Sequence, residues 1–220
     1  MPQRAQRLLL PGPTGVLETL IEVAGENSAE PPPAVGVVCH PHPLYGGTLD
    51  NKVVHTLSRA LHQVGIPTLR FNFRGVGQST GEYGHGNGET QDALAVVAAA
   101  RERWPAAEPW LLGFSFGGIV ALRAAVQARA GCLVTVAPAV GRIEAGDAVP
   151  RCPWLLVQGD ADEVIDPREV LEWAAAAQPS PQLRVLPGAS HFFHGRLPEL
   201  REAVAAFARE VLVAARRPGS

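Results

Sequence analysis

Hydrophobic residues occur along this 220-residue chain in two alternating patterns. Short continuous runs of β-branched and other apolar residues are typical of strands that are buried on both faces. Between these runs, apolar residues recur every three or four positions, as in Val54, Leu57, Leu61 and Val64, which is typical of amphipathic helices. We therefore expect strands and helices to alternate along most of the chain.

The pattern predicts eight strands, joined by turns rich in glycine and proline or by helices. The expected strands are residues 7–10, 16–23, 34–40, 67–73, 109–114, 132–137, 152–158 and 182–188. The expected helices are residues 50–65, a segment carrying Ala93 to Trp104, 115–128, 166–177 and a segment carrying Leu200 to Val211. This order predicts an α/β fold in which a mostly parallel, twisted sheet carries helices on both faces. The first two strands should be antiparallel, and one domain spanning residues 1–220 accounts for all elements.

Composition favours a globular protein, because 46% of the residues are hydrophobic and only 18% are charged. Nineteen basic and twenty-one acidic residues give a net charge of −2, which offers no general attraction for nucleic acid or for an anionic membrane. Cys39, Cys132 and Cys152 are odd in number and lack metal-site spacing, so we expect reduced thiols. No apolar stretch approaches about 18 residues. These features together predict a cytoplasmic protein.

Ser115 lies in "GFSFG", residues 113–117, where an expected strand passes into an expected helix. This is the G-x-S-x-G pattern of a sharp strand–turn–helix elbow, which needs small residues two positions before and after the serine and exposes its hydroxyl. A serine that merely caps a helix is the alternative. The strand–turn–helix context favours a nucleophile.

A serine hydroxyl needs a base and an orienting carboxylate, which follow it in the order acid, then histidine, in this class of fold. "GDADEVIDP" follows one strand and "GASHFFHG" follows the last. Because the loops after parallel strands share one edge of the sheet, these segments can converge on Ser115. Among the acids, Asp166 suits a helix N-cap, Glu163 suits solvent and Asp160 suits a turn, which leaves Asp162 as the preferred partner. Of the two histidines, His191 precedes aromatic residues and is preferred to His194.

The chain resembles the α/β-hydrolase superfamily in "GFSFGG", "GDADEV" and "GASHFF". This resemblance implies Ser115 as nucleophile, Asp162 as acid and His191 as base. "FNFRGVGQSTG" is similar to a D-x-R-G-x-G-x-S segment of the superfamily, with Asn72 in place of the usual aspartate. "HPHPLYGG" resembles the H-P-H-P-L-x-G-G signature of a group of small bacterial hydrolases that lack a lid.

The segment after the third strand, "CHPHPLYGG", is expected to supply half of an oxyanion hole. Since Pro41 and Pro43 have no N–H, the backbone amides of Leu44 or Tyr45 are predicted as one donor, with the amide of Phe116 as the other. His40 and His42 could instead hold a metal ion, but no acidic or histidine partner lies close in sequence, and no metal is expected.

The interval 137–152, where many relatives carry a lid, is too short for a helical cap. The sequence therefore predicts an open site, shaped by Tyr45, Phe114, Phe116, Phe192 and Phe193, of which Tyr45, Phe114 and Phe192 are expected to contact substrate.

Together these features predict a serine hydrolase that forms an acyl-enzyme without a cofactor, with a short-chain or exposed carboxylic ester as its small-molecule substrate. A thioesterase, a peptidase-like amidase and a non-catalytic binding module on the same fold remain as alternatives.

Overall fold

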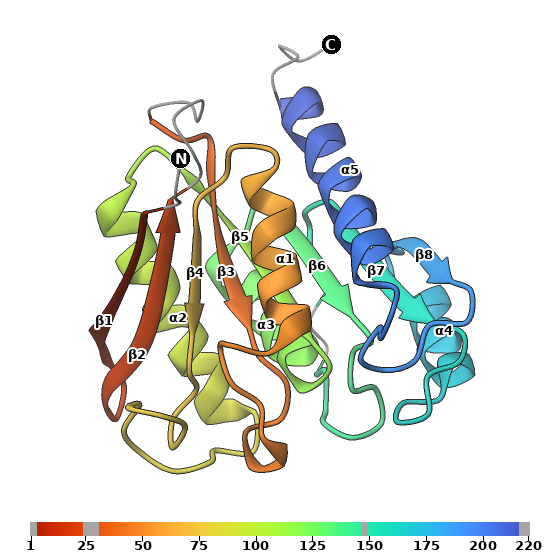
Figure 1. Ribbon diagram of the computed structural model, residues 1–220, viewed down its shortest axis with the longest axis horizontal. Coiled ribbons are helices and arrows are strands. Elements are labelled where there is room, and N and C mark those ends of the chain that lie inside the picture. Colours follow the sequence, from red (N-terminus) through yellow and green to blue (C-terminus); the bar gives the residue numbers. More distant parts are fainter. Residues whose placement is uncertain (1–3, 24–30, 147–148, 216–220) are drawn as a thin grey trace.

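The computed structural model describes residues 4–23, 31–146 and 149–215. Its described strands form one eight-stranded sheet in the order β1-β2-β4-β3-β5-β6-β7-β8 (Figure 1). The strands are β1 Arg4–Gly12, β2 Gly15–Val23, β3 Ala34–Cys39, β4 Thr68–Phe71, β5 Glu108–Phe114, β6 Cys132–Val136, β7 Trp154–Gly159 and β8 Gln182–Leu186. β1 and β2 form an antiparallel hairpin that pairs with β4, and every other pairing is parallel.

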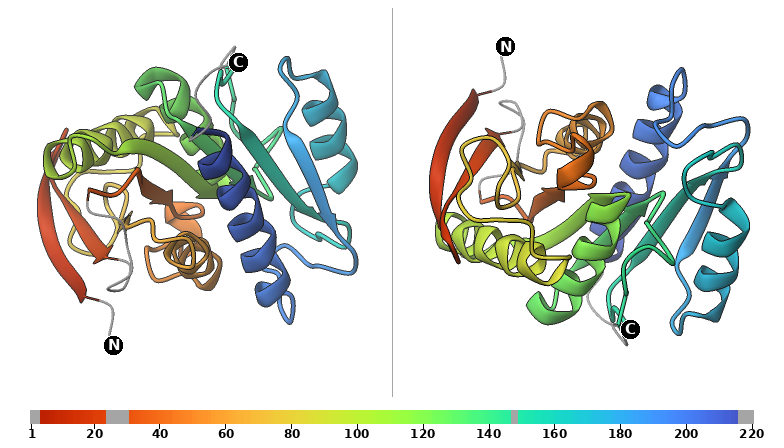
Figure 2. Two further views of the ribbon diagram at one scale, coloured as in Figure 1. Left: turned by 90° about the horizontal axis from the view of Figure 1, so that it is seen from above. Right: turned by 90° about the horizontal axis from the view of Figure 1, so that it is seen from below.

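Helices cover both faces of this sheet, which is why strands such as β3 and β7 consist entirely of buried residues (Figures 1 and 2). The helices are α1 Lys52–His62, α2 Asn87–Arg103, α3 Phe116–Ala128, α4 Pro167–Ala176 and α5 Leu197–Ala215. α1 and α5 pack together on one face, whereas α2, α3 and α4 share the apolar cluster on the other. The predicted α/β-hydrolase architecture is confirmed.

Helix ends follow local chemistry. Asp166 caps α4 by accepting a hydrogen bond from the Arg168 amide, with Pro167 at the first helical position, as the sequence predicts. Asn51 caps α1 in the same way through the amides of Val53 and Val54. A 3₁₀ turn, Pro43–Tyr45, was not predicted, because it spans only three residues.

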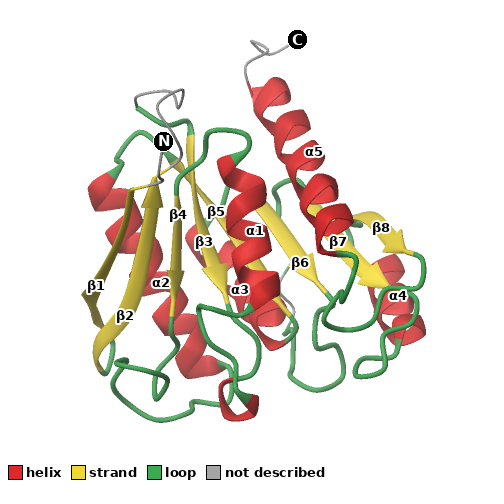
Figure 3. Cartoon of the chain, viewed as in Figure 1, coloured by secondary structure: helices red, strands yellow, loops and turns green. Residues whose placement is uncertain are grey.

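The carboxyl ends of the parallel strands lie along the lower edge of the sheet in Figure 1. The connection between β6 and β7, residues 137–153, contains no helix in the part that the structure describes (Figure 3). The described residues therefore form no lid domain over this edge. None of the described helices is long and apolar enough to cross a membrane.

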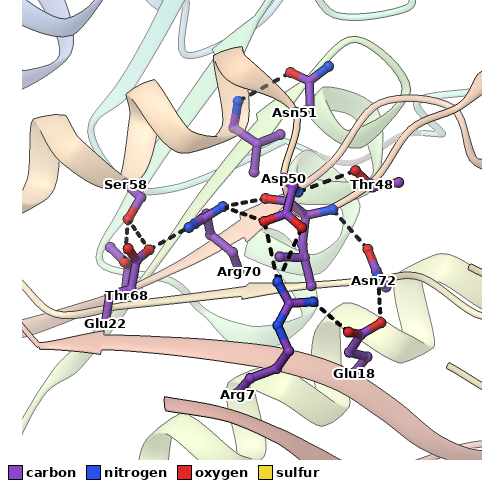
Figure 4. Close-up of polar contacts among 12 residues, drawn as sticks. Arg7, Glu18, Glu22, Thr48, Asp50, Asn51, Ser58, Thr68, Arg70 and Asn72 are labelled. Carbon is purple, nitrogen blue, oxygen red and sulfur yellow. Dashed lines mark hydrogen bonds and ion pairs between the residues drawn. The ribbon is translucent and has the colours of Figure 1, made fainter. Parts of the chain in front are cut away.

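A polar network joins the antiparallel side of the sheet to the chain before α1 (Figure 4). It consists of the buried Glu18, Glu22, Arg70 and Asn72 together with the exposed Arg7. Arg70 donates to the Glu22 carboxylate, at 2.8 Å, and to the carbonyl of Leu49. Asn72 accepts from the Leu49 amide and donates to Glu18, both over distances below 3 Å. The network fixes the segment around Leu49 onto β2 and β4.

Asn72 replaces the aspartate that is usual in this segment of the superfamily, and its neighbours give the reason. Its amide nitrogen lies 2.7 Å from a carboxylate oxygen of Glu18 while its oxygen accepts from Leu49. An aspartate would place two carboxylates in direct contact, which is unfavourable because like charges at that distance cannot both stay ionised. The asparagine amide donates to Glu18 and accepts from Leu49 at once, whereas an ionised carboxylate could only accept.

Candidate active site

Ser115 lies between the end of β5 and the first residue of α3, with backbone angles φ 56° and ψ −120°. A positive φ is costly for a residue with a Cβ atom, and the surroundings hold it in place. The Ser115 amide donates to the Val136 carbonyl, and the Ser115 carbonyl accepts from the amides of Gly118 and Ala139. The strand–turn–helix elbow expected from the sequence is therefore present.

The elbow is tight enough to require glycine on both sides of Ser115. A Cβ atom on Gly113 would lie 2.0 Å from the Gly117 carbonyl oxygen. A Cβ atom on Gly117 would lie 2.3 Å from the His40 carbonyl oxygen. The second contact also shows that the chain after β3 packs directly against the elbow.

The structure brings Ser115, His191 and Asp162 together from the carboxyl ends of three strands. His191 Nε2 lies 3.1 Å from Ser115 Oγ, and His191 Nδ1 lies 2.8 Å from Asp162 Oδ2. All three residues are buried. Since the carboxylate can only accept, Nδ1 carries the proton and Nε2 is left to accept from the serine hydroxyl.

Asp162 is held as a charged acceptor. Its Oδ1 accepts from the amides of Val164 and Ile165, each at 2.9 Å, and its Oδ2 accepts from Gln158 as well as His191. Burial opposes the charge, but the hydrogen bonds from His191, Ile165 and Val164 outweigh it and lower the pKa of the Asp162 carboxyl. A negative charge thus faces the imidazole.

The competing residues have other roles in the structure. Asp160 accepts from the Gly188 amide, which closes the turn after β8, and Asp166 caps α4. Glu163, expected to face only solvent, is exposed but also accepts from the backbone amide of His191. His194 is exposed and contacts the ring of Phe192.

Two of the aromatic residues near His191 need correction. Phe114 was expected to contact substrate, but it is fully buried, and its ring packs 5.0 Å from the imidazole of His191. Phe193, expected to shape the site, is likewise buried in the core. Phe192 is 41% exposed and packs edge-on against the His191 ring. Phe114 therefore supports the imidazole from the side of the apolar core, to which Phe193 also belongs.

The expected donors in the chain after β3 also need correction. The amide of Leu44 donates to His42 Nδ1, and the amide of Tyr45 donates to the His42 carbonyl, so the 3₁₀ turn uses both. The amides of His42 and Phe116 donate to no other group among the described residues, and both residues line the cavity beside Ser115. His42 lies between two prolines and keeps its N–H, a signal in the sequence that the prediction missed.

The two histidines of this segment use their ring nitrogens within the protein. His40 Nε2 accepts from the Phe73 amide and its Nδ1 donates to the Pro41 carbonyl, while burial lowers the pKa of His40 to about 4. His42 Nδ1 accepts from Leu44, and its Nε2 lies 3.1 Å from the Tyr83 hydroxyl. This arrangement serves to shape the loop.

A cavity of about 340 Å³ opens beside Ser115. Its described lining combines hydroxyl, imidazole and guanidinium groups with an apolar wall: His42, Tyr45, Tyr83, Ser115, Phe116, Ala139, Arg142, Ile143, Val164 and Ile165. Tyr45, 86% exposed, lies at its rim as expected. Tyr83 and Arg142 were not predicted. Tyr83 lies just beyond the motif at residues 71–81, and the loop of Arg142 carries no recognisable motif.

The chain is similar to several known proteins. The profile of the family described as serine aminopeptidase, S33, matches residues 45–151. An uncharacterised protein of Rickettsia prowazekii is 32% identical over 198 residues, which cover 85% of this chain and 83% of the relative.

Two solved structures are more similar still. An α/β serine hydrolase without a lid from Xanthomonas campestris is 40% identical, with a TM-score of 0.90 over 96% of both chains. An α/β serine hydrolase homologue from Coxiella burnetii is 42% identical, with a TM-score of 0.87 over 91% of this chain and 96% of its own. The chain therefore belongs to the α/β-hydrolase superfamily, and specifically to its serine hydrolases.

Proposed function

We propose that the protein is a carboxylesterase that cleaves its substrate through a Ser115 acyl-enzyme. The observation that carries this proposal is the continuous hydrogen-bonded chain from Asp162 through His191 to the hydroxyl of Ser115. A binding module would have no use for a buried imidazole that links a carboxylate to a hydroxyl on a strained backbone. The intact chain therefore favours catalysis over the non-catalytic alternative.

In the first half of the reaction, His191 Nε2 takes the proton of Ser115 Oγ as the oxygen attacks the ester carbonyl carbon. Asp162 keeps the proton on Nδ1 and stabilises the imidazolium that forms. The imidazolium then protonates the departing alkoxide as the bond between carbonyl carbon and ester oxygen breaks. The acyl group remains on Ser115.

The negative oxygen of the tetrahedral intermediate is held by two backbone amides, those of Phe116 and His42. Phe116 begins α3, so its amide also lies at the positive end of the helix dipole. Each such donor contributes on the order of 10²–10³ in rate. In the second half, His191 deprotonates a water molecule, which attacks the acyl carbon and releases a carboxylic acid and free Ser115.

The substrate is proposed to be an ester with a short acyl chain. The cavity of about 340 Å³ accommodates a small group, and since the described residues form no lid, a longer acyl chain would lie in water. Hydrolysis of p-nitrophenyl esters should therefore be fastest for acetate to hexanoate and fall for longer chains. Faster hydrolysis of long-chain triglycerides than of these esters contradicts the proposal.

The match to serine aminopeptidases makes a peptide amide the second candidate. An aminopeptidase must hold the positive α-ammonium group of its substrate, which calls for a carboxylate in the site. The described residues that line the cavity include no aspartate or glutamate, and they include Arg142, which repels a cation. This difference favours an ester.

The central test is labelling with a fluorophosphonate probe, which reacts with an activated serine. The wild-type protein should be labelled and the Ser115→Ala variant should not. Ser190→Ala serves as the matched control, because Ser190 immediately precedes His191 but lies outside the proposed chain of proton transfer. Labelling of both Ser115→Ala and wild type, or of neither, overturns the assignment.

A further inference from the structure

The side chains that line the cavity beside Ser115 include several hydrogen-bond donors but no carboxylate. Its polar side chains are those of His42, Tyr45, Tyr83, Ser115 and Arg142, and its remaining described lining is apolar. Arg142 is the one formally charged residue among them. Such a lining favours a substrate group that accepts hydrogen bonds and carries negative charge.

The backbone of Arg142 is held at a fixed place relative to the nucleophile. The Ala139 amide donates to the carbonyl of Ser115 itself, at 3.1 Å, and the Arg142 amide donates to the Ala139 carbonyl, at 3.2 Å. On the other side of Arg142, Arg123 donates to the Glu144 carbonyl and to the side chain of Asn87. The loop is therefore tied both to the elbow and to the helices behind it.

The guanidinium of Arg142 forms no ion pair with any described residue. The guanidinium groups of Arg70 and Arg74, by contrast, are bonded to the carboxylates of Glu22 and Asp92. Arg142 is exposed at the cavity wall, so its planar set of donors remains available to a ligand.

Tyr83 adds a second donor by an argument from tautomers. His42 Nδ1 accepts from the Leu44 amide, so a neutral His42 carries its proton on Nε2 and donates it to the Tyr83 oxygen, 3.1 Å away. Burial lowers the pKa of His42 and raises that of Tyr83, so both stay neutral near pH 7. The Tyr83 hydroxyl then has its own hydrogen left to donate, and it lines the cavity.

The loop that carries Tyr83 is itself rigid. The amides of Gly84 and Gly86 both donate to the buried carboxylate of Glu89, at 2.7 Å each. Tyr83 also packs against His85 and His42. Its hydroxyl is thus held in place before any substrate arrives, which lowers the entropic cost of binding.

The side of the substrate that enters the cavity follows from the proposed reaction. The leaving alkoxide must depart next to His191 to receive its proton, and His191 is not among the residues that line the cavity. The cavity therefore takes the acyl side.

We propose that the natural substrate is an ester whose acyl group carries a free carboxylate, a monoester of a short dicarboxylic acid, bound by Arg142 and the Tyr83 hydroxyl. The proposal rests on the esterase function proposed above. A carboxylate suits a single arginine, because the two oxygens match the paired N–H groups of one guanidinium.

The test compares matched ester pairs by the release of ethanol. The monoethyl esters of succinate, glutarate and adipate are each paired with a neutral ester of equal acyl length, ethyl butanoate, pentanoate and hexanoate. For each protein variant the readout is the ratio of kcat/KM for the charged ester to kcat/KM for its neutral counterpart. Wild type should prefer the charged member of at least one pair.

Arg142→Gln should lower that ratio about tenfold, the lower end of the range for a charge-assisted hydrogen bond, because Arg142 is exposed to solvent. Arg142→Lys should keep more of the preference, and Tyr83→Phe should lose less of it than Arg142→Gln. Arg151→Gln removes an equivalent exposed charge outside the cavity and should leave the ratio at the wild-type value.

A wild-type protein that prefers the neutral ester in all three pairs overturns the proposal, as does an unchanged ratio in Arg142→Gln. An equal drop for Arg151→Gln also overturns it, because the preference would then reflect overall charge. Failure of the esterase function is visible separately: wild type would not hydrolyse the neutral esters, or Ser115→Ala would still do so.

Discussion

Two polar clusters of this sheet both stabilise buried carboxylates by hydrogen bonds, but they have different roles. On the antiparallel side, Glu18 and Glu22 accept hydrogen bonds from arginine and asparagine side chains (Figure 4). At the carboxyl edge, Asp162 accepts from two amides, a glutamine and an imidazole. In each cluster, hydrogen bonds outweigh the cost of burial and lower the pKa of the carboxyl group.

The difference lies in how each cluster ends. Arg70 joins Glu22 to the carbonyl of Leu49, so the first cluster closes on the protein itself. The second ends at the hydroxyl of Ser115, on a backbone with φ 56° and beside an open cavity. A buried carboxylate therefore stabilises the fold where its partners are all internal, and prepares a reactive group where the last partner faces a ligand.

The comparison is tested most strongly by Asp162→Asn. Asparagine keeps the shape of the side chain but no longer favours the tautomer with the proton on Nδ1, so kcat for a p-nitrophenyl ester should fall about 10⁴-fold. Asp160→Asn is the matched control, because its carboxylate holds Gly188 and not the imidazole. A loss of less than tenfold in Asp162→Asn would exclude Asp162 as the orienting acid.

Arg70→Met should instead lower the unfolding free energy and leave catalysis largely unchanged. It leaves Glu22 buried without its cation, which typically costs about 3–5 kcal/mol of unfolding free energy. Urea denaturation measures this loss, and Arg184→Met, at an exposed position on β8, should change stability little. The rate per folded molecule should change far less than in Asp162→Asn. If Arg70→Met left stability unchanged but lowered kcat strongly, the first cluster would contribute to catalysis as well as to the fold.

The buried His40 should make the stability of the protein depend on pH. His40 has a pKa of about 4 in the folded protein and 6.5 when unperturbed, because burial disfavours its charged form. Between these values the unfolded chain binds more protons, so the unfolding free energy should fall as the pH decreases from 6.5 to 4. The loss from His40 alone is about 3 kcal/mol, at 1.36 kcal/mol per pKa unit.

Urea denaturation across this range checks that prediction. His40→Gln should flatten the decline, whereas replacement of the exposed His194 by glutamine should leave it as in wild type. Equal slopes for wild type and His40→Gln would mean that the imidazole is not the group responsible.

The smallest expected effect concerns the strained backbone of the elbow. Ser115→Gly and Ser115→Ala both remove the hydroxyl, but only glycine relieves the cost of the positive φ. Ser115→Gly should therefore be more stable than Ser115→Ala by about 1 kcal/mol, after the greater entropy of unfolded glycine is subtracted. Thermal and urea unfolding of the two variants give the difference directly. Equal stabilities would show that the elbow is not strained.

Much of the fold could be predicted from the sequence because its signals are local. The short continuous apolar run of residues 109–114 is typical of a strand covered on both faces, and Asp166 with Pro167 marks a helix start. The steric demand for glycine at 113 and 117 is equally local. The convergence of Ser115, Asp162 and His191 followed from the rule that loops after parallel strands share an edge.

The errors arose where a residue's role depends on neighbours distant in sequence. Phe114 was expected to contact substrate, yet its side chain is buried because it packs against the ring of His191. The amides of Leu44 and Tyr45 are used up by a turn of only three residues. Arg142 and Tyr83 enter the cavity because of how their loops are tied down, which no spacing along the chain encodes.

The connection from β6 to β7 carries Arg142 at the cavity, and its described residues form neither helix nor strand. Its backbone is held at two points: the Ala139 amide donates to the Ser115 carbonyl, and the Glu144 carbonyl accepts from the Arg123 side chain. Neither bond uses a side chain of the connection itself. Mutations of side chains in this connection can therefore alter which substrates bind and leave Ser115, Asp162 and His191 unchanged. Natural selection or protein design can therefore change the substrate specificity of this fold here at little cost in stability.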